Sequence, residues 1–431
     1  MATAGAPVPL SDGPVERDRS ADYINRTPTV AGISQKRIAG FFDALVRPAQ
    51  EHEFVDLMLD RISVGRRMTF QAVAGPQPAH DRIVHRSRNP IYLQEWWWEV
   101  AGGGRHQLVA VFENGREVGR LLYFPRTRHS MGLFGFTEGV HAPWTNYCAP
   151  TIDAEAGDSD AARQGDVAYE LARQLPRRIS YRLTCPHFTH DAVLAAFERA
   201  GFGIDTQRSY LVDLRGAGIK SIIEHLDMST RQRYRKAEKK LDVVAIGPSM
   251  FFDLYRRNLA ARDKISYHDL SVAESLASTC LSRGSGCVRI TAAKAKGAPG
   301  DDPRSYHAAI ACLQDDAFSY YWMSTRNINA TDSDIRNGAV KLLLVDAIAH
   351  ASQAGLVFDF DGATTRGTSE LYRGFRGTEV NRYALIRKTL PARAIAIVRN
   401  IVTGVPRLLA RRKRLLRQLA GACRLSWRKR D

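Results

Sequence analysis

Residues 338–362 have the sequence GAVKLLLVDAIAHASQAGLVFDFDG, and this stretch decides the fold. Apolar side chains recur every three or four residues along one face, which predicts a helix from Gly338 to Ser352. Gly355 suits the left-handed residue that ends a helix. The apolar run Val357–Phe360 that follows predicts a buried strand. A helix, a glycine and a strand in this order are typical of an α/β protein.

The sequence on either side extends this unit. Before it, the apolar runs His307–Leu313 and Ala317–Met323 flank a turn at residues 314–316, which predicts a β-hairpin. After it, Ser369–Phe375 predicts a short helix and Glu379–Ile386 predicts a last strand. The predicted order is therefore hairpin, helix, strand, helix, strand.

An earlier part of the chain has the same predicted order. Asn114-Gly115 is a strong signal for a hairpin turn, and apolar runs lie on both sides of it. The elements expected in this copy are the strands Leu108–Phe112 and Arg116–Phe124, the helix Ala161–Gln174, the strand Ile179–Leu183, the helix Thr189–Ala200 and the strand Arg208–Leu214. A repeated order of elements indicates two copies of one fold. We therefore expect a mixed α/β protein with two tandem domains and a cleft between them.

The segment between the two copies has its own predicted elements. Residues 230–241 predict a basic helix, Asp242–Ile246 a strand, and Phe251–Arg262 and Ala273–Leu281 two further helices. We assign this segment to the second domain.

Length and composition set the expected domain boundaries. The chain has 431 residues, whereas a single hydrophobic core stops growing near ~250–300 residues. We expect a disordered start over residues 1–35, a first domain over 36–214, a second domain over 215–390 and a basic helical tail over 391–431. No run of ~18 apolar residues is free of charge, and the first residues lack the pattern of a secretory signal. The six cysteines are scattered, which indicates reduced thiols, so we expect a cytoplasmic protein.

The positive charge is concentrated in the tail. The chain has 62 Lys and Arg against 45 Asp and Glu, for a net charge of +17. Residues 392–431 contain a run of these cations and one acid, Asp431, and their apolar side chains share helical faces. This pattern is typical of a helix that lies on an anionic membrane surface, here the inner face of the membrane. RNA binding and a packed helix with a solvated end remain the alternatives.

Several motifs together resemble a known family. They are residues 92–97 (YLQEWW), 230–239 (TRQRYRKAEK), 320–322 (YYW), 341–349 (KLLLVDAIA), 358–362 (FDFDG) and 371–375 (LYRGF). In this order they resemble the branch of the GNAT superfamily that contains the Fem peptidoglycan aminoacyltransferases and the cellulose-biosynthesis-type (BioF2-like) acetyltransferases. The resemblance covers roughly Tyr92 to Lys388.

The resemblance implies an acyltransferase of the cell envelope. It implies transfer of an acetyl, longer acyl or aminoacyl group onto an amine or hydroxyl of an envelope or polysaccharide precursor. The co-substrate would be acyl-CoA or aminoacyl-tRNA, with no permanently bound cofactor and no metal. Nucleic acid is then a partner only if the donor is aminoacyl-tRNA. A non-catalytic double GNAT-fold protein that binds tRNA or anionic lipid is the alternative.

The resemblance also implies a donor site. GNAT enzymes that use acetyl-CoA carry a glycine-rich loop before the main helix, and its amides hold a pyrophosphate. The matching residues here are Arg336, Asn337, Gly338 and Ala339, a shortened version with one glycine. These four residues are the predicted donor site, and they favour neither donor.

A basic stripe is the first candidate for substrate binding. Arg231, Arg235 and Lys239 are spaced by four residues, so a helix places them on one face. Arginine binds carboxylate or phosphate with two hydrogen bonds, which suits an anionic substrate. A solvated basic face is the alternative.

Two carboxylates are the candidates for catalysis. Asp359 and Asp361 alternate with two phenylalanines, so a strand places both acids on one side. A carboxylate at a strand end could take the proton from an attacking amine or hydroxyl. We favour Asp361 because it ends the strand and is expected to be accessible. A turn residue at Asp361 and an arginine partner for Asp359 are the alternatives.

Other residues near that strand are weaker candidates. Tyr321, Trp322 and Arg373 are predicted to contact the substrate, with core packing as the alternative for the aromatic residues and a surface position for the arginine. Cys185, His187 and His190 offer only three ligands, whereas a structural zinc site needs four. We therefore expect a histidine there to cap a helix.

Overall fold

The computed structural model describes residues 90–130, 134–152, 161–284, 287–298, 302–362, 366–390 and 392–393. All of them belong to a unit that spans His80–Asp431, and the other unit, Met1–Ala79, lies outside the described residues. The expectations of a disordered start and of an amphipathic tail beyond Arg393 also lie outside them. The predictions for residues 90–390 can be compared with the structure.

The first half contains the first predicted copy of the repeat. Its elements are η3 (Ile91–Leu93), α3 (Glu95–Gly102), β1 (Gln107–Glu113), β2 (Arg116–Ser130), β3 (Phe134–Val140), β4 (Thr151–Ile152), α4 (Ala161–Gln174), β5 (Ser180–Cys185), α5 (Asp191–Arg199) and β6 (Gly203–Val212). Every element predicted in this half is present within a few residues. The resemblance at residues 92–97 is to the family's opening Trp-containing helix, and α3 begins there at Glu95, whereas sequence reasoning missed β3 and β4.

The second half contains the second copy and the segment that precedes it. Its elements are α6 (Ile219–His225), α7 (Met228–Glu238), β7 (Leu241–Ala245), α8 (Pro248–Ala260), α9 (Leu270–Ser282), β8 (Val288–Ala295), η5 (Pro303–Ser305), β9 (Tyr306–Gln314), β10 (Phe318–Arg326), α10 (Ser333–Gln353), β11 (Val357–Asp359), α11 (Arg366–Arg373) and β12 (Thr378–Arg387). The repeat is visible as β2, β3, α4, β5, α5, β6 in one half and β9, β10, α10, β11, α11, β12 in the other. The hairpin that corresponds to β9–β10 is therefore β2–β3, and the expectation that the hairpin around Asn114-Gly115 corresponds to it is wrong.

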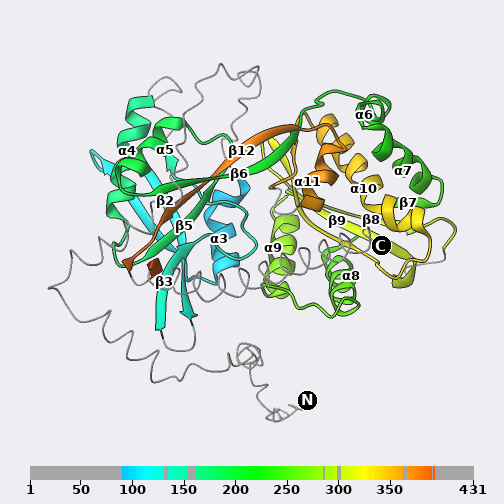
Figure 1. Ribbon diagram of the computed structural model, residues 1–431, viewed down its shortest axis with the longest axis horizontal. Coiled ribbons are helices and arrows are strands. Elements are labelled where there is room, and N and C mark those ends of the chain that lie inside the picture. The colour runs from blue at the N-terminus through cyan, green and yellow to red at the C-terminus, as the bar shows by residue number, and fades with distance from the viewer. Residues whose placement is uncertain are drawn as a thin grey trace, which may run out of the picture. The chain divides into compact units, whose positions relative to one another are not determined.

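The two halves share one mixed sheet of twelve strands. The strands are ordered β1-β2-β3-β5-β12-β6-β11-β10-β9-β8-β7, with β4 paired to β2. β3 runs parallel to β5, and β10 runs parallel to β11, whereas the other pairs are antiparallel. The last strand of each half lies inside the other half: β12 fills the place beside β5, and β6 fills the place beside β11 (Figure 1). The mixed α/β class is therefore confirmed.

The exchange of last strands is symmetric. β6 and β12 pair over nine positions, from Thr378↔Leu211 to Ile386↔Gly203, so the middle pair is Arg382↔Gln207. Each strand has ten residues. The two tandem domains expected from the sequence are thus joined through main-chain hydrogen bonds into one sheet. Arg382 lies at the centre of that junction.

Helices cover both faces of the second half. One core cluster contains side chains of α6, α7 and α10, together with Phe358 and Phe360 of the segment that ends β11. The other contains side chains of α3, α8 and α9. This arrangement buries the β-sheet between two apolar layers, as expected for an α/β fold. Phe358 and Phe360 face the same core cluster, as the alternation predicts. β11 ends at Asp359, and Asp361 follows it with a left-handed φ of 56°, so the expectation that Asp361 ends the strand is wrong and the turn alternative describes it.

The start of α10 differs from the prediction. The helix begins at Ser333, five residues before Gly338. Asp332 caps it, because its Oδ1 accepts hydrogen bonds from the amides of Asp334 and Ile335. An aspartate at this position satisfies amides that a helix leaves free. The apolar period used for the prediction does not extend into this polar first turn.

Candidate functional site

The parting of β10 from β11 is the main feature of the second half. The two strands pair over three residues, from Phe318↔Val357 to Tyr320↔Asp359. β10 then continues to Arg326 and pairs with β9 alone, with a bulge between Tyr321 and Met323. Among the described residues, no main-chain group pairs with the other edge of β10 beyond Tyr320. Unpaired strand edges offer hydrogen bonds to an extended ligand.

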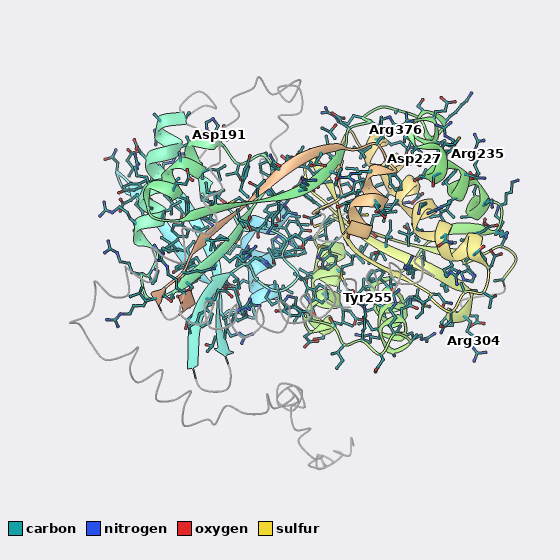
Figure 2. The ribbon with its side chains drawn as sticks, in the orientation of Figure 1. Asp191, Asp227, Arg235, Tyr255, Arg304 and Arg376 are labelled. Atoms are coloured by element: carbon teal, nitrogen blue, oxygen red, sulfur yellow. The ribbon has the colours of Figure 1, made fainter. Side chains whose placement is uncertain are left out.

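A small pocket lies at the end of this open strand. It has a volume of about 140 Å³, and its walls come from α8, β10 and α10. Asn258 of α8 donates a hydrogen bond to Thr325 Oγ1 at 2.8 Å, and Arg262 Nη2 donates to the carbonyl of Arg326 at 3.2 Å. Tyr255 (Figure 2) and Val340 also line the pocket. No acidic side chain is among its described walls.

Cations from three elements gather beside this pocket. Lys341 follows Val340 on α10, and its Nζ donates to the carbonyl of Asn337 at 3.2 Å. Burial, then the neighbouring charges of Arg233 and Arg326, lower the pKa of Lys341 to about 8, while Asp227 opposes them. A basic group with a lowered pKa beside two arginines marks a place where an anion is favoured.

The first turn of α10 is closed by its own side chains. Asp332 caps the helix, and Lys240 Nζ lies 2.7 Å from Asp332 Oδ2 and 3.3 Å from Asp334 Oδ2. Lys236 Nζ lies 3.2 Å from Asp334 Oδ1. These lysines lower the pKa of both carboxyl groups, so the acids stay charged. The amides that hold an anion at an open helix start are occupied here by Asp332.

The predicted donor residues lie inside α10 and not in a loop before it. Arg336 and Asn337 are exposed, whereas Gly338 and Ala339 are buried. A Cβ on Gly338 would lie 2.7 Å from the carbonyl oxygen of Arg233 and 2.7 Å from the Cβ of Ala237. Gly338 therefore allows α7 and α10 to pack closely. The donor-binding role of these residues stays a prediction.

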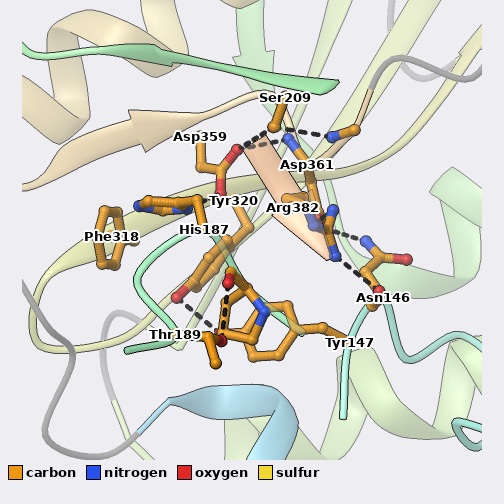
Figure 3. A network of polar contacts seen from close by, with 12 residues as sticks. Asn146, Tyr147, His187, Thr189, Ser209, Phe318, Tyr320, Asp359, Asp361 and Arg382 are labelled. Atoms are coloured by element: carbon orange, nitrogen blue, oxygen red, sulfur yellow. Dashed lines mark hydrogen bonds and ion pairs between the residues drawn. The ribbon is translucent and has the colours of Figure 1, made fainter. Parts of the chain in front are cut away.

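Asp361 belongs to a buried ion pair at the junction of the halves. Arg382 Nη1 donates to its Oδ1 at 2.5 Å, and the side chains of Asp361 and Arg382 are 1% and 4% exposed. Tyr92 donates to Oδ2 at 2.9 Å, and Asn146 donates to the same oxygen. Arg382 Nη2 also donates to the carbonyl of Asn146 at 2.7 Å (Figure 3). The expectation that Asp361 is accessible is therefore wrong.

Asp359 lies in the same network. Its Oδ1 accepts a hydrogen bond from Ser209 at 2.8 Å and from the amide of Asp361 at 2.8 Å (Figure 3). Its Oδ2 lies 3.7 Å from Nδ1 of His187, a ring whose pKa burial lowers to about 3, so the ring is neutral. Burial also raises the pKa of Asp359 and Asp361, and the charge of Arg382 opposes that rise. The catalytic roles of Asp359 and Asp361 stay predictions.

The basic stripe of α7 divides in the structure. Arg231 Nη2 donates to the carbonyls of Glu224 and Leu226 at 2.7 and 2.9 Å, which caps the end of α6. Arg235 and Lys239 are exposed, and Figure 2 shows Arg235 at the outer side of α7. Arg233, which sequence reasoning passed over, is the cation of this helix that lies near Lys341.

The other predicted substrate residues make structural contacts. The ring of Tyr321 packs edge-to-face against Phe360 and Tyr372. Trp322 Nε1 donates to the carbonyl of Trp144 at 3.0 Å. Arg373 is exposed and lies 4.0 Å from Glu379. Substrate contact by these three residues stays a prediction.

The Cys185 region behaves as a helix start. Nδ1 of His190 accepts a hydrogen bond from the amide of Ala192, which confirms a histidine cap for α5. Within the described ranges, no three His, Cys, Asp or Glu side chains are grouped as a metal site would require. The part of the chain that the structure describes also has no helix long and apolar enough to cross a membrane.

Two residues of the site could have been found from the sequence. Arg382 is a charged residue inside the predicted strand Glu379–Ile386, and a buried charge requires a partner. Arg233 lies inside the basic run of residues 230–239, two residues from both Arg231 and Arg235. The walls from α8 and the turn after it, which include Asn258 and Arg262, carry no local signal because the fold alone brings them to β10.

No protein-family model matches the chain, and no curated protein sequence matches it. The chain is similar to the crystal structure of FemX, with 11% identity, coverage of 72% of this chain and 95% of that chain, and a TM-score of 0.48. It is also similar to the C-terminal domain (DUF2156) of a putative lysylphosphatidylglycerol synthetase from Agrobacterium fabrum, with 16% identity, coverage of 68% and 88%, and a TM-score of 0.43. A tandem GNAT protein from the clavulanic acid biosynthesis pathway is similar at 9% identity, 66% and 83% coverage, and a TM-score of 0.35. These similarities concern the fold alone.

Proposed function

We propose that the protein is an acyltransferase of the Fem and BioF2-like kind that binds its donor in the second half. The acyl or aminoacyl group would pass to an amine or hydroxyl of an envelope or polysaccharide precursor. The observation that carries the proposal is the open edge of β10 beyond Tyr320, with a polar pocket at its end. An extended arm that contains amides can pair with such an edge as an added strand does.

The charges beside the pocket support an anionic donor. Arg233, Arg326 and Lys341 lie near one another, and Arg262 reaches the pocket from the turn after α8. Acyl-CoA and aminoacyl-tRNA both carry phosphates, so either donor suits this charge. The closed first turn of α10 would move the phosphate from the helix start toward these side chains.

Asp361 is the candidate for accepting the acceptor's proton, but its side chain is buried. Asp361 is neutralised by Arg382 and covered by Tyr92 and Asn146, so it contacts no open space among the described residues. A role in positioning fits this geometry better than a role as general base. Asp361 holds Tyr92 and Asn146, which belong to the first half, against the end of β11.

A second candidate function is a non-catalytic binding protein for tRNA or anionic lipid. The closed first turn of α10 favours it, because the usual anion site of an acetyltransferase is filled by Asp332. The two functions differ in their product. Only the acyltransferase yields an acylated acceptor that mass spectrometry detects.

The experiment fills the pocket and measures donor binding. Val340→Trp places a large ring among the pocket walls, and Gln353→Trp places the same ring at the exposed far end of α10. Acetyl-CoA and lysyl-tRNA are the probes, measured by calorimetry and by fluorescence. We expect one probe to bind the natural protein and the Gln353→Trp variant equally, and Val340→Trp to weaken it at least tenfold, about 1.4 kcal/mol. Equal binding to both variants would exclude the pocket as the donor site.

A further inference from the structure

A groove in the first half lies away from the pocket at β10. It encloses about 780 Å³ and is formed by β3, the loop before β5, the end of α5 and the segment after β12. The segment is held in place by Thr389, whose Oγ1 lies 3.0 Å from Ser180 Oγ and whose amide donates to the same oxygen at 3.0 Å. A groove of this volume is large enough for a small ligand.

The groove is strongly cationic. Its walls include Arg177, Arg178, Arg387, Lys388 and Arg393, and no acid is among its described walls. Arg387 forms part of the floor, since its guanidinium lies 4.9 Å from the ring centre of Tyr181 and donates to the carbonyls of Leu175 and Pro176. The other four cations form no ion pair among the described residues. Unpaired cations around a concave surface favour an anionic ligand.

Apolar side chains accompany these cations. Phe136 of β3 and Ala200 after α5 contribute to the walls, and Leu390 lies at the rim with 72% of its surface exposed. An exposed leucine next to lysine and arginine is typical of a surface that meets lipid headgroups and the first acyl carbons. A ligand with only phosphate groups would leave these apolar atoms without a partner.

The basic tail is not a suitable occupant for the groove. Residues 392–431 begin at the groove and carry 12 cations and one acid in the sequence, so they have the same sign of charge as its walls. Like charges repel, and both segments would therefore attract the same anionic partner.

We propose that the groove binds the phosphate headgroup of an anionic phospholipid at a membrane surface. Arg177 and Arg178 bind the phosphate oxygens, and Leu390 contacts the first acyl carbons. This site is separate from the donor pocket and does not depend on the proposed function. It would orient the first half toward a membrane that contains anionic lipid.

The experiment measures binding of a soluble short-chain lipid to the full chain. The probe is dihexanoyl phosphatidylglycerol below its micelle concentration, with dihexanoyl phosphatidylcholine and glycerol 1-phosphate for comparison. We expect saturable binding of the first lipid, and binding at least tenfold weaker for the other two. Arg177→Ser combined with Arg178→Ser should weaken binding of the first lipid at least tenfold.

A control pair removes the same charge elsewhere. Lys264→Ser with Arg304→Ser alters two exposed cations of the second half, and Figure 2 shows Arg304 at its outer side. Binding by this variant should stay within twofold of the natural protein. Equal losses in both double variants, or no binding of the lipid, would overturn the proposal. Glycerol 1-phosphate bound as tightly as the lipid would also overturn it, as would an RNA hairpin that displaces the lipid and loses more affinity in the Arg177/Arg178 variant.

Discussion

The two halves treat the same parting of strands in opposite ways. β3 and β5 pair in parallel over three residues, from Glu138↔Ser180 to Val140↔Arg182, just as β10 and β11 do. In the first half the chain then turns back and fills the gap. The amide of Cys148 donates to the carbonyl of Thr184 at 2.7 Å, and Tyr147 lies beside it, fully buried. The first half closes its own parting, whereas the second half keeps an open edge.

This difference gives the two copies of the fold different surroundings at the same strand pair. The returning segment of the first half supplies Asn146, and η3 supplies Tyr92, and both contact Asp361 of the second half. The segment that closes the gap between β3 and β5 therefore also supplies Asn146, one of the hydrogen-bond partners of Asp361 just after β11. The second half retains the pocket and the nearby cations, where we propose that the donor binds.

The largest expected effect comes from breaking the central ion pair. Arg382→Met leaves Asp361 buried without its cation, and loss of one partner of a buried pair costs about 3–5 kcal/mol. The control is Arg208→Met on the neighbouring strand, where Arg208 and Glu379 form a pair with side chains 61% and 41% exposed. Such a surface pair is worth about 0–1 kcal/mol. Urea unfolding of both variants measures the difference.

A second variant separates the ion pair from the packing of Arg382. Asp361→Asn combined with Arg382→Met removes both charges, so it should recover part of the lost free energy of unfolding. A loss in Arg382→Met no larger than in Arg208→Met would show that the halves do not depend on this contact. Main-chain pairing between β6 and β12 would then account for the joining of the two halves without the ion pair.

The fold was predictable from the sequence because its signals are local. Asn114 and Gly115 have φ angles of 52° and 80°, as the predicted hairpin turn requires, and Gly355 ends α10 with φ 73°. β3 was missed because its sequence, FGFTEGV, contains two glycines and lacks a clear apolar period. The exchange of β6 and β12 could not be predicted, since it depends on pairing between residues about 170 positions apart.

The site was less predictable because its parts come together only in the fold. The strand alternation holds as far as Asp359, but Asp361 lies in a turn after the strand, and its burial depends on Tyr92, Asn146 and Arg382 from distant segments. Charge runs identified α7 but not the side of it that faces Lys341. Periodicity places residues on a face, whereas burial requires knowledge of what covers that face.

A smaller effect tests why Gly338 is a glycine. Its added methyl group would lie 2.7 Å from main-chain and side-chain atoms of α7, so Gly338→Ala should force the helices apart at a cost of about 1–3 kcal/mol. Gly367→Ala is the matched control in α11, since nothing lies within 4 Å of its added methyl group. That variant should be neutral or slightly stabilising. Equal stability of the two variants in thermal melting would exclude close packing of α7 and α10 as the reason for a glycine at position 338. Donor binding would then be the remaining explanation.

The smallest expected effect concerns the charge of Lys341, which lies beside the open parting of the second half. Its pKa is lowered from 10.5 to about 8 in the folded protein, by burial and by Arg233 and Arg326. Between pH 8 and pH 10.5 the unfolded chain therefore binds more protons than the folded protein, and stability rises with pH in that window. Below pH 8 both states are protonated and the full destabilisation is present. Lys341→Met should raise the melting temperature at pH 7 by roughly 1–2 °C, as about 1 kcal/mol does in a folded unit longer than about 300 residues. This advantage should decrease toward zero by pH 10.5, whereas Lys220→Met on exposed α6 should show no such trend. A difference that stays constant across this range would mean that Lys341 keeps its ordinary pKa, and the proposal that Arg233, Arg326 and Lys341 favour an anion would lose its main support.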